Sequence, residues 1–237
     1  MNHQRIIVAL DVDTPDKAVK LVDQLRDYVG AFKVGLELVN SAGLSVFDKI
    51  KDAGAMRIFY DCKFHDIPNT VAGAARAAVR IGVWALNVHC SGGSAMMKAA
   101  KDAALAEAGK LGVAPPLVLG VTLLTSIDQD QLLDELRVPD TVSSYVEHMA
   151  RTAQAAGLDG VVASPHEIKL IRSACGPSFT IVTPGVRPAG AEQGDQKRVM
   201  TPEEAVSAGA DYIVIGRPIT QAPDPQAAAR DIAATLP

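Results

Sequence analysis

The sequence predicts an α/β protein, a single (β/α)8 TIM barrel over residues 1–237, because strand-like and helix-like segments alternate along it. The strand-like runs are RIIVALD (5–11), AFKVG (31–35), RIFYD (57–61), VWALNVH (83–89), PLVLGVT (116–122), LDGVVAS (158–164), FTIVTPG (179–185) and DYIVIGR (211–217). Their nearly continuous apolar character is typical of a parallel sheet covered by helices. The eight runs favour closure into a barrel, a fold that commonly takes about 250 residues. An open doubly wound sheet is the alternative.

Helices are predicted between these runs from apolar spacing and from the residues that begin and end them. Ala18, Leu21, Val22 and Leu25 fall at i, i+3, i+4 and i+7, so they would share the face that covers the sheet. Proline, which the first helical turn tolerates, marks four predicted helix starts, at Thr14-Pro15, Ile67-Pro68, Thr201-Pro202 and Ala222-Pro223. Glycine in a left-handed C-terminal cap is expected at Gly30, Gly54, Gly82, Gly157 and Gly209.

Composition and charge argue against several classes of partner. A formal net charge of −4 and the lack of a dense Lys/Arg run give no electrostatic footprint for nucleic acid. Cys62, Cys90 and Cys175 are odd in number and lack C-x-x-C spacing, so we expect reduced thiols rather than disulfides or a zinc site. The apolar run that ends at Leu10 is too short for a signal peptide, and no stretch approaches the about 18 apolar residues of a membrane span. We therefore expect a cytoplasmic protein with no membrane partner.

Polar residues gather where the predicted strands end, which is the rim that carries the active site in barrels of this kind. They are Asp11, Lys33, Asp61, Lys63, His89, Thr122, Thr125, Arg187 and Arg217. One aspartate after a strand is usually a helix cap, but seven strand ends that converge on one rim are harder to explain as caps. We interpret these residues as a ligand site, and a structural ion-pair cluster is the alternative.

The stretch FYDCKFHDIPNT (59–70) concentrates charge at one of these strand ends. Because side chains alternate along a strand, Asp61 and Lys63 should share one face, with Cys62 on the other. Asp66 lies beyond the strand. The proline that follows Ile67 restricts that residue to an extended backbone and begins a helix, which fixes the loop that carries Asp66.

The segment DCKFHDIPNT resembles the D-x-K-x-x-D-I-P-x-T signature of the orotidine 5'-phosphate decarboxylase family, in its bacterial form. The resemblance extends along essentially the whole chain, through VALD, FKVGLEL, NVHCSGG with Asn87 in place, VTLLTS, TPGVRP, GDQKR and YIVIGRPI. Cys62 stands where leucine is expected, at a position that should face away from the ligand. The joint match of these segments is highly specific.

The resemblance implies loss of CO2 from carbon 6 of orotidine 5'-phosphate, which gives UMP in pyrimidine biosynthesis without a cofactor or metal. An alternating array of charges would surround the reacting carbon, and the matching residues are Lys33, Asp61, Lys63 and Asp66. Lys63 would protonate carbon 6. Asp61 would lie beside the substrate carboxylate.

The resemblance also implies the residues that bind the rest of the substrate. Gly216, Arg217 and Arg187 would hold the phosphate, and Gln196 would bridge phosphate and pyrimidine. The other implied contacts are Thr125 at the amide edge of the pyrimidine, and Asp11, Lys33, Asp66, Ile67 and Thr70 around the ribose. Pro184 is a further implied substrate-binding residue. The glycine-rich and proline-rich segment 184–198 is expected to act as a lid. Relatives of this kind are homodimers, in which Asp66, Ile67 and Thr70 would complete the active site of the neighbouring subunit.

Two other functions remain as alternatives. A magnesium-dependent decarboxylase of a keto-sugar phosphate, such as 3-keto-gulonate 6-phosphate, shares the D-x-K-x-x-D pattern, but the sequence shows no additional acidic pair for that metal, and the segments IPNT, LTS and GDQ favour orotidine phosphate. A non-catalytic nucleotide-binding barrel would need the same binding residues, but Lys63 and Asp61 argue against it. His65 and His89 are expected to be structural rather than catalytic.

Overall fold

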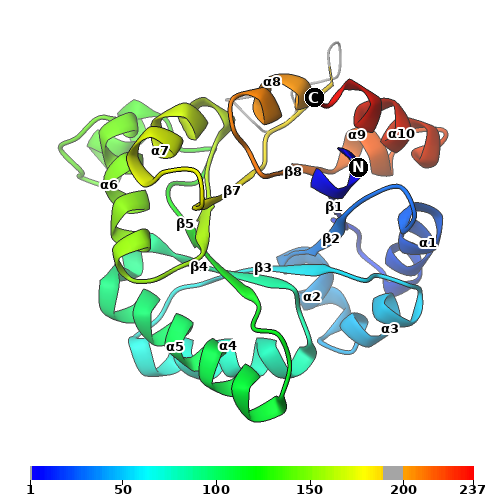
Figure 1. The fold of residues 1–237 in the computed structure, drawn as a ribbon, viewed down its shortest axis with the longest axis horizontal. Coiled ribbons are helices and arrows are strands. Elements are labelled where there is room, and N and C mark those ends of the chain that lie inside the picture. Colours follow the sequence, from blue (N-terminus) through cyan, green and yellow to red (C-terminus); the bar gives the residue numbers. More distant parts are fainter. Residues whose placement is uncertain (1, 189–199) are drawn as a thin grey trace.

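The computed structural model describes residues 2–188 and 200–237, which form a closed barrel of parallel strands (Figure 1). The strands are β1 Ile6–Ala9, β2 Ala31–Val34, β3 Ile58–Phe64, β4 Ala85–His89, β5 Leu117–Val121, β6 Gly160–Val162, β7 Thr180–Thr183 and β8 Tyr212–Ile215. Each pairs with the next along the chain, and β8 closes the ring on β1. The predicted (β/α)8 barrel and its eight strands are confirmed, and the open sheet is excluded.

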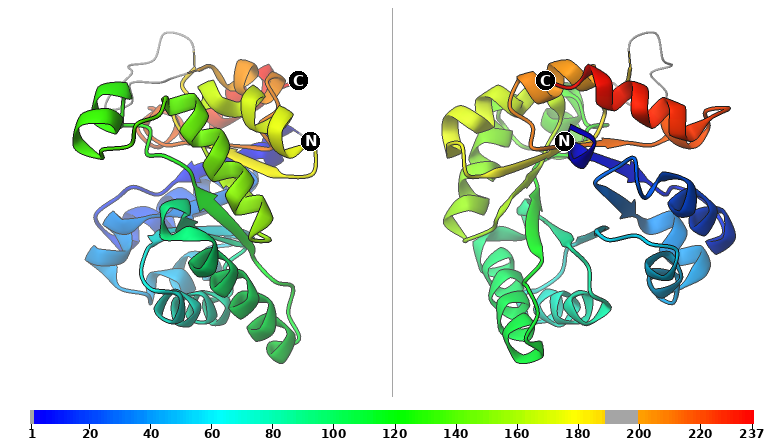
Figure 2. Two further views of the ribbon diagram at one scale, coloured as in Figure 1. Left: turned by 90° about the vertical axis from the view of Figure 1, so that its left-hand side faces the viewer. Right: turned by 45° about the vertical axis from the view of Figure 1, so that its right-hand side comes forward.

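Helices surround the ring of strands, as Figures 1 and 2 show. They are α1 Pro15–Leu25, α2 Leu36–Ala42, α3 Val46–Asp52, α4 Pro68–Ile81, α5 Gly93–Leu111, α6 Val142–Ala155, α7 Ile168–Cys175, α8 Pro202–Ser207, α9 Arg217–Thr220 and α10 Pro225–Thr235. Single helical turns are η1 Asn2–Arg5, η2 Cys90–Gly92, η3 Gln131–Glu135 and η4 Pro165–Glu167. No helix in the described part of the chain is long and apolar enough to cross a membrane.

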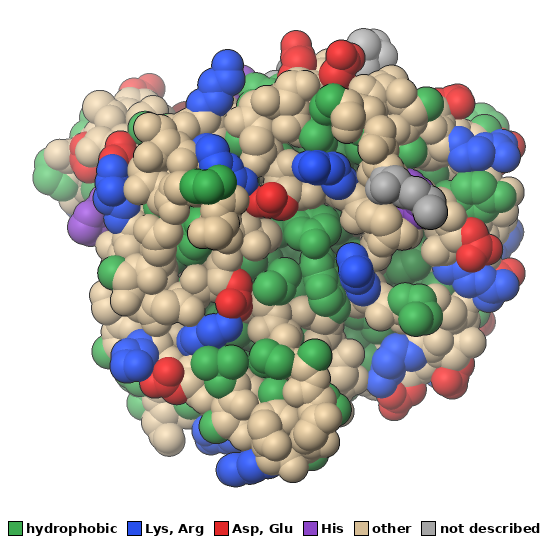
Figure 3. All heavy atoms as spheres, in the orientation of Figure 1, with side chains coloured by type: hydrophobic (Ala, Val, Ile, Leu, Met, Phe, Trp, Pro, Cys, Tyr) green, Lys and Arg blue, Asp and Glu red, His purple; other side chains and the backbone are tan. Residues whose placement is uncertain are grey.

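Two hydrophobic clusters follow from the alternation of side chains along the strands. The inner one fills the barrel and includes Ile7, Ala31, Phe59 and Val182. The outer one lies between strands and helices, and includes residues of opposite parity such as Ile6. On the face shown in Figure 3, hydrophobic side chains gather over the middle of the ring, with charged side chains around them. The inner cluster forms the bottom of the cavity described below, and the polar residues of the site lie above it, closer to the carboxyl ends of the strands.

Three of the four predicted proline starts are confirmed, at Pro15, Pro68 and Pro202. The fourth is wrong, because α10 begins at Pro225 rather than Pro223. The Asp224 side chain caps this helix by accepting a hydrogen bond from the backbone N–H of Ala227 at 3.0 Å. An aspartate satisfies an N–H group at a helix start, which the alanine before Pro223 cannot do.

Four of the five predicted glycine caps have the expected positive φ, namely Gly54, Gly82, Gly157 and Gly209. Gly30 is the exception. A Cβ atom there would lie 2.1 Å from the carbonyl oxygen of Gln4, so this glycine allows two backbone segments to approach closely. The three cysteines are free and buried, as expected.

Candidate active site

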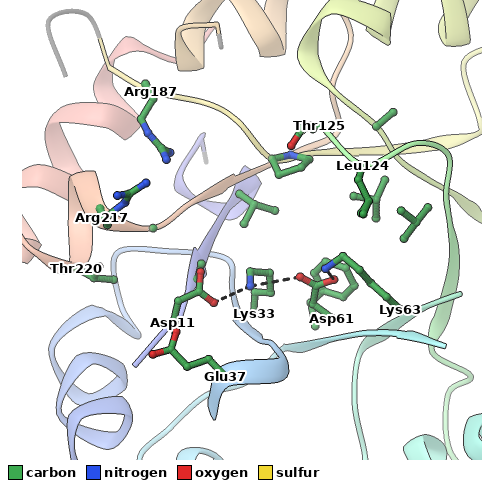
Figure 4. A pocket seen from close by; sticks show the side chains of 18 of the residues that line it. Asp11, Lys33, Glu37, Asp61, Lys63, Leu124, Thr125, Arg187, Arg217 and Thr220 are labelled. Carbon is green, nitrogen blue, oxygen red and sulfur yellow. Dashed lines mark hydrogen bonds and ion pairs between the residues drawn. The ribbon is translucent and has the colours of Figure 1, made fainter. Parts of the chain in front are cut away.

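A cavity of about 530 Å³ opens at the carboxyl ends of the strands (Figure 4). Its floor consists of inner-cluster residues such as Ala9, Phe59 and Val121. Among the residues proposed from the sequence, the cavity is lined by Asp11, Lys33, Asp61, Lys63, Thr125, Pro184, Arg187, Gly216 and Arg217. Segments that are far apart in the chain therefore meet at one rim.

Four of these side chains form a continuous chain of alternating charge. The ammonium Nζ of Lys33 lies 2.9 Å from Oδ1 of Asp11 and 3.3 Å from Oδ2 of Asp61. The Nζ of Lys63 lies 2.7 Å from Oδ1 of Asp61. These four residues, the charge array Asp11–Lys33–Asp61–Lys63, lie at the carboxyl ends of β1, β2 and β3 (Figure 4).

Lys33 and Asp61, the two largely buried members of the array, are held in their charged forms by their neighbours. Burial alone would lower the pKa of Lys33, but the carboxylates of Asp61 and Asp11 outweigh it and raise this pKa above its usual value. Burial alone would raise the pKa of Asp61, but the ammonium groups of Lys33 and Lys63 hold it below its usual value. Both shifts favour the charged forms of Lys33 and Asp61 at neutral pH.

Strand alternation explains most of this placement. Asp11, Lys33 and Asp61 have the parity of the inner-cluster residues Ala9, Ala31 and Phe59, so they point to the barrel interior above them. Lys63 departs from regular strand geometry, because its φ is 48° and the pairing of β3 with β4 shifts register between Tyr60 and Phe64. The predicted meeting of Asp61 and Lys63 is observed, but on a distorted backbone.

Two guanidinium groups converge at the other end of the cavity. Arg187 follows β7, and Arg217 is the first residue of α9, directly after Gly216. In Figure 4 their side chains point toward the same region, across the cavity from Lys63. Planar guanidinium groups match the oxygens of a phosphate or carboxylate, so this end of the cavity suits an anionic group.

Comparison with known proteins agrees with this geometry. The family model described as "Orotidine 5'-phosphate decarboxylase / HUMPS family" matches residues 4–232. The chain belongs to this family.

Relatives in the orotidine 5'-phosphate decarboxylase / HUMPS family match over nearly the full length of the chain. A protein named orotidine 5'-phosphate decarboxylase from Moorella thermoacetica is 57% identical over 232 residues, which are 98% of this chain and 92% of that protein. A protein of the same name from Syntrophomonas wolfei is 51% identical over 99% of this chain and 98% of its own. The crystal structure of orotidine 5'-phosphate decarboxylase from Lactobacillus acidophilus is 40% identical, covers 98% of both chains and has a TM-score of 0.86.

Three residues that the family resemblance assigns to a substrate site are outside this cavity. Asp66, Ile67 and Thr70 are exposed, on the loop after β3 and the first turn of α4. Oδ1 of Asp66 accepts a hydrogen bond from the backbone N–H of Ile67 at 2.6 Å. Within one chain, the structure does not bring these residues to the cavity lined by Asp61 and Lys63. Gln196, and positions 189–198 of the lid expected over 184–198, lie outside the described residues.

His89 and Thr122 also do not line the cavity, although both were expected at the rim. The ring centroids of His89 and His65 are 5.3 Å apart, so the two side chains pack against each other. Burial, and then the nearby His65 and Lys63, lower the pKa of His89. Thr122 is buried, and its hydroxyl lies 3.3 Å from the carbonyl oxygen of Val162.

Sequence reasoning missed several lining residues, including Glu37, Thr220 and Gln221. Glu37 lies at the start of α2, and Figure 4 shows it close to Asp11. Thr220 is three positions after Arg217 on the short helix α9. An i, i+3 relation to a proposed phosphate ligand was the signal for Thr220, because residues so spaced share one helix face.

Proposed function

We propose that the protein decarboxylates orotidine 5'-phosphate to UMP in pyrimidine biosynthesis, without a cofactor. The observation that carries this proposal is one cavity with an alternating Asp–Lys array at one end and two guanidinium groups at the other. A nucleoside monophosphate whose base carries a carboxylate has charged groups at both ends that match those of the cavity. Its phosphate suits the guanidinium end, and its reacting carbon suits the array.

The chemistry needs placed charges rather than electron delocalisation. When CO2 leaves, carbon 6 keeps a lone pair in the plane of the ring, where no carbonyl group can delocalise it. The ammonium group of Lys63 attracts this charge and then donates a proton to carbon 6. Because the attraction grows as CO2 departs, it stabilises the transition state more than the bound substrate.

Asp61 contributes in a second way. Its carboxylate is held ionised between Lys33 and Lys63, at 3.3 Å and 2.7 Å from their ammonium nitrogens. A substrate carboxylate placed beside it is repelled, and this repulsion is relieved as CO2 leaves. Lys63 is expected to contribute more to catalysis than Asp61, because it both stabilises the developing charge and donates the proton.

The phosphate end supplies binding energy that the array alone lacks. Two unit charges about 4 Å apart interact by about 4 kcal/mol at an effective dielectric constant of about 20. Enzymes lower barriers by about 8–23 kcal/mol, so one contact is insufficient. In the proposal, Arg217, Arg187 and the backbone N–H of Gly216 hold the phosphate, and this remote energy aligns the base with the array.

The remaining contacts are assigned by position in the cavity. Asp11 and Lys33 bind the ribose hydroxyl groups, and Thr125 contacts the amide edge of the pyrimidine, next to Pro184. These four residues line the cavity. Gln196, between phosphate and pyrimidine, and the lid over 184–198 remain part of the proposal. The direct test is the loss of orotidine absorbance when purified protein is added to orotidine 5'-phosphate, and unchanged absorbance would refute the function.

Chelation distinguishes this reaction from the magnesium-dependent decarboxylation of a keto-sugar phosphate. We expect full activity after exhaustive treatment with EDTA, because the ammonium groups of Lys33 and Lys63 supply the positive charge at the reacting carbon. The measurement is the rate of absorbance loss before and after chelation. Activity that disappears in EDTA and returns with added magnesium would move the assignment to the keto-sugar reaction.

We further propose that the protein acts as a cytoplasmic homodimer, as a single catalytic domain over 1–237 with shared active sites. Asp66, Ile67 and Thr70 support this, because they carry family motif positions yet face outward in one chain. Ile67 is 67% exposed in one chain, so its side chain is accessible to a second chain. In the dimer these residues complete the neighbouring cavity.

Mixing two inactive variants tests the shared site. Lys63→Ala and Asp66→Ala homodimers should each be nearly inactive, but in a mixed dimer one site collects both changes and the other collects neither. After subunit exchange at equal concentrations we expect activity from about a quarter of the sites, by two-fold symmetry. The measurement is turnover before and after mixing. A stable mixed dimer without recovered activity would show that Asp66 acts within its own chain.

A further inference from the structure

Asn87 is a fully buried polar residue in β4, directly below the charge array. It shares the inward parity of the inner-cluster residue Ala85, but it does not line the cavity. It is therefore placed to act on the array without touching a ligand. A buried amide needs partners for both of its ends, and the partners identify what it does.

The two ends of the Asn87 side chain bind two different members of the array. Its Nδ2 donates a hydrogen bond to Oδ1 of Asp61 at 2.8 Å. Its Oδ1 accepts a hydrogen bond from the backbone N–H of Lys63 at 2.7 Å. An amide can make both bonds because it carries a donor and an acceptor side by side. If the Asn87 amide were turned over, its oxygen would face the Asp61 carboxylate and both hydrogen bonds would be lost.

The backbone of Lys63 explains why this support is needed. Tyr60 pairs with Leu86, and the next pair is Phe64 with Val88, so three residues of β3 face Asn87 alone. In this bulge Lys63 has a φ of 48°, in the left-handed region that side-chain-bearing residues seldom adopt. The Asn87 oxygen takes the N–H that the register shift removes from the regular ladder.

We infer that Asn87 is a positioning residue, whose amide holds Lys63 in its left-handed conformation and turns the Asp61 carboxylate toward the ammonium groups. This inference rests on the proposed decarboxylation, because it explains how the proton donor is held at carbon 6. In this conformation the Lys63 ammonium donates to Oδ1 of Asp61 at 2.7 Å, and Asn87 donates to the same oxygen at 2.8 Å. One side chain thereby sets the relative position of both groups.

The first test is Asn87→Ala, which removes both hydrogen bonds. We expect kcat to fall by about 10²-fold, the size of loss that a displacement of about 1 Å produces. The affinity for UMP, measured by calorimetry, should stay within a few-fold of wild type, because its phosphate and ribose contacts come from other strands. If Asn87 contributed only to general stability, Asn87→Ala would lower the melting temperature, but kcat would not fall while the affinity for UMP stayed the same.

A matched control is Thr183→Val. Thr183 is also a fully buried polar residue near the carboxyl end of a strand, and within the described structure its hydroxyl has no hydrogen-bond partner. Removing that hydroxyl changes a buried polar group without touching the array. We expect kcat and UMP affinity to match wild type.

The second test is Asn87→Asp, which keeps the shape but replaces the donor by a carboxyl group. When ionised, this group repels Asp61, whereas when protonated it can donate a hydrogen bond as the amide does. The titratable groups around it are Asp61, Lys33, Lys63 and Cys62, with the His65 and His89 pair near Lys63. Burial and the charge of Asp61 raise the pKa of an introduced carboxyl, so kcat of this variant should rise as the pH falls toward acid, unlike that of wild type.

The outcomes separate the inference from the proposed function. Wild-type protein without turnover would refute the proposed function and this inference with it. If wild type is active, Asn87→Ala with near-normal kcat, or with UMP affinity lost in proportion to kcat, would refute the positioning role alone. Should Asn87→Ala not fold, as judged by circular dichroism, the pH profile of Asn87→Asp decides, and a profile parallel to that of wild type would overturn the inference.

Discussion

Lys63→Ala should abolish turnover while leaving the fold and the binding of UMP in place. The change removes the proton donor, worth about 10²–10⁴-fold, together with a positive charge at the developing carbanion, worth about 10²–10³-fold. We therefore expect kcat to fall by more than about 10⁴-fold. UMP lacks the carboxylate and is held by its phosphate, ribose and pyrimidine contacts, so its dissociation constant should change little.

Lys101→Ala is the matched control for this variant. Lys101 is also a lysine paired with an aspartate, since its Nζ lies 2.6 Å from Oδ1 of Asp159, but it does not line the cavity. Its removal should lower the melting temperature and leave kcat unchanged. Near-normal turnover of Lys63→Ala in the same assay would refute the proton-donor assignment.

Arg217→Ala should weaken catalysis severely although Arg217 lies across the cavity from Lys63 (Figure 4). A guanidinium group can make two parallel hydrogen bonds to a phosphate, each worth about 1.5–3 kcal/mol, so we expect kcat/KM to fall by about 10²-fold or more. Because the missing group is a cation that pairs with phosphate, free guanidinium ion added to the assay should restore part of the rate. The measurement is kcat/KM as a function of guanidinium concentration.

Arg151→Ala provides the control for this rescue. Arg151 lies on α6, pairs with Glu147 at 2.9 Å and does not line the cavity, so its removal should leave kcat/KM unchanged, and guanidinium should have no restoring effect. If Arg217→Ala instead shows nearly normal kcat/KM, the phosphate does not drive catalysis. Binding energy from the phosphate would then not be a source of the lowered barrier.

The sequence predicted the barrel because its signals are local and repeat in every unit. Asp11, Lys33 and Asp61 could be placed on one rim because parity along a strand and the common direction of parallel strands suffice to locate them. Proline at a first helical turn and glycine at a helix end are equally local signals, and Pro15 and Gly82 followed them.

Other features depend on contacts between distant segments, which no local pattern reveals. Gly30 is required by the approach of Gln4, and the backbone of Lys63 is distorted by a register shift against β4. Glu37 reaches the cavity because α2 begins directly beside Asp11, not because of a motif of its own. The positions of Asp66, Ile67 and Thr70 follow from the fold of one chain, whereas their proposed role depends on a second chain.

The charge array has a consequence for how the site responds to the reaction. Asp11, Lys33, Asp61 and Lys63 carry two negative and two positive charges, so their formal charges sum to zero. Decarboxylation moves a negative charge from a carboxylate to a ring carbon without changing the total charge of the bound molecule. Because the array is neutral as a whole, it interacts weakly with the total charge of the bound molecule. Because its charges alternate, it interacts strongly with the position of that charge. It is therefore preorganised for the charge distribution that exists after CO2 has left. Water would have to reorient around the new carbanion, whereas here the orientation is set when the chain folds.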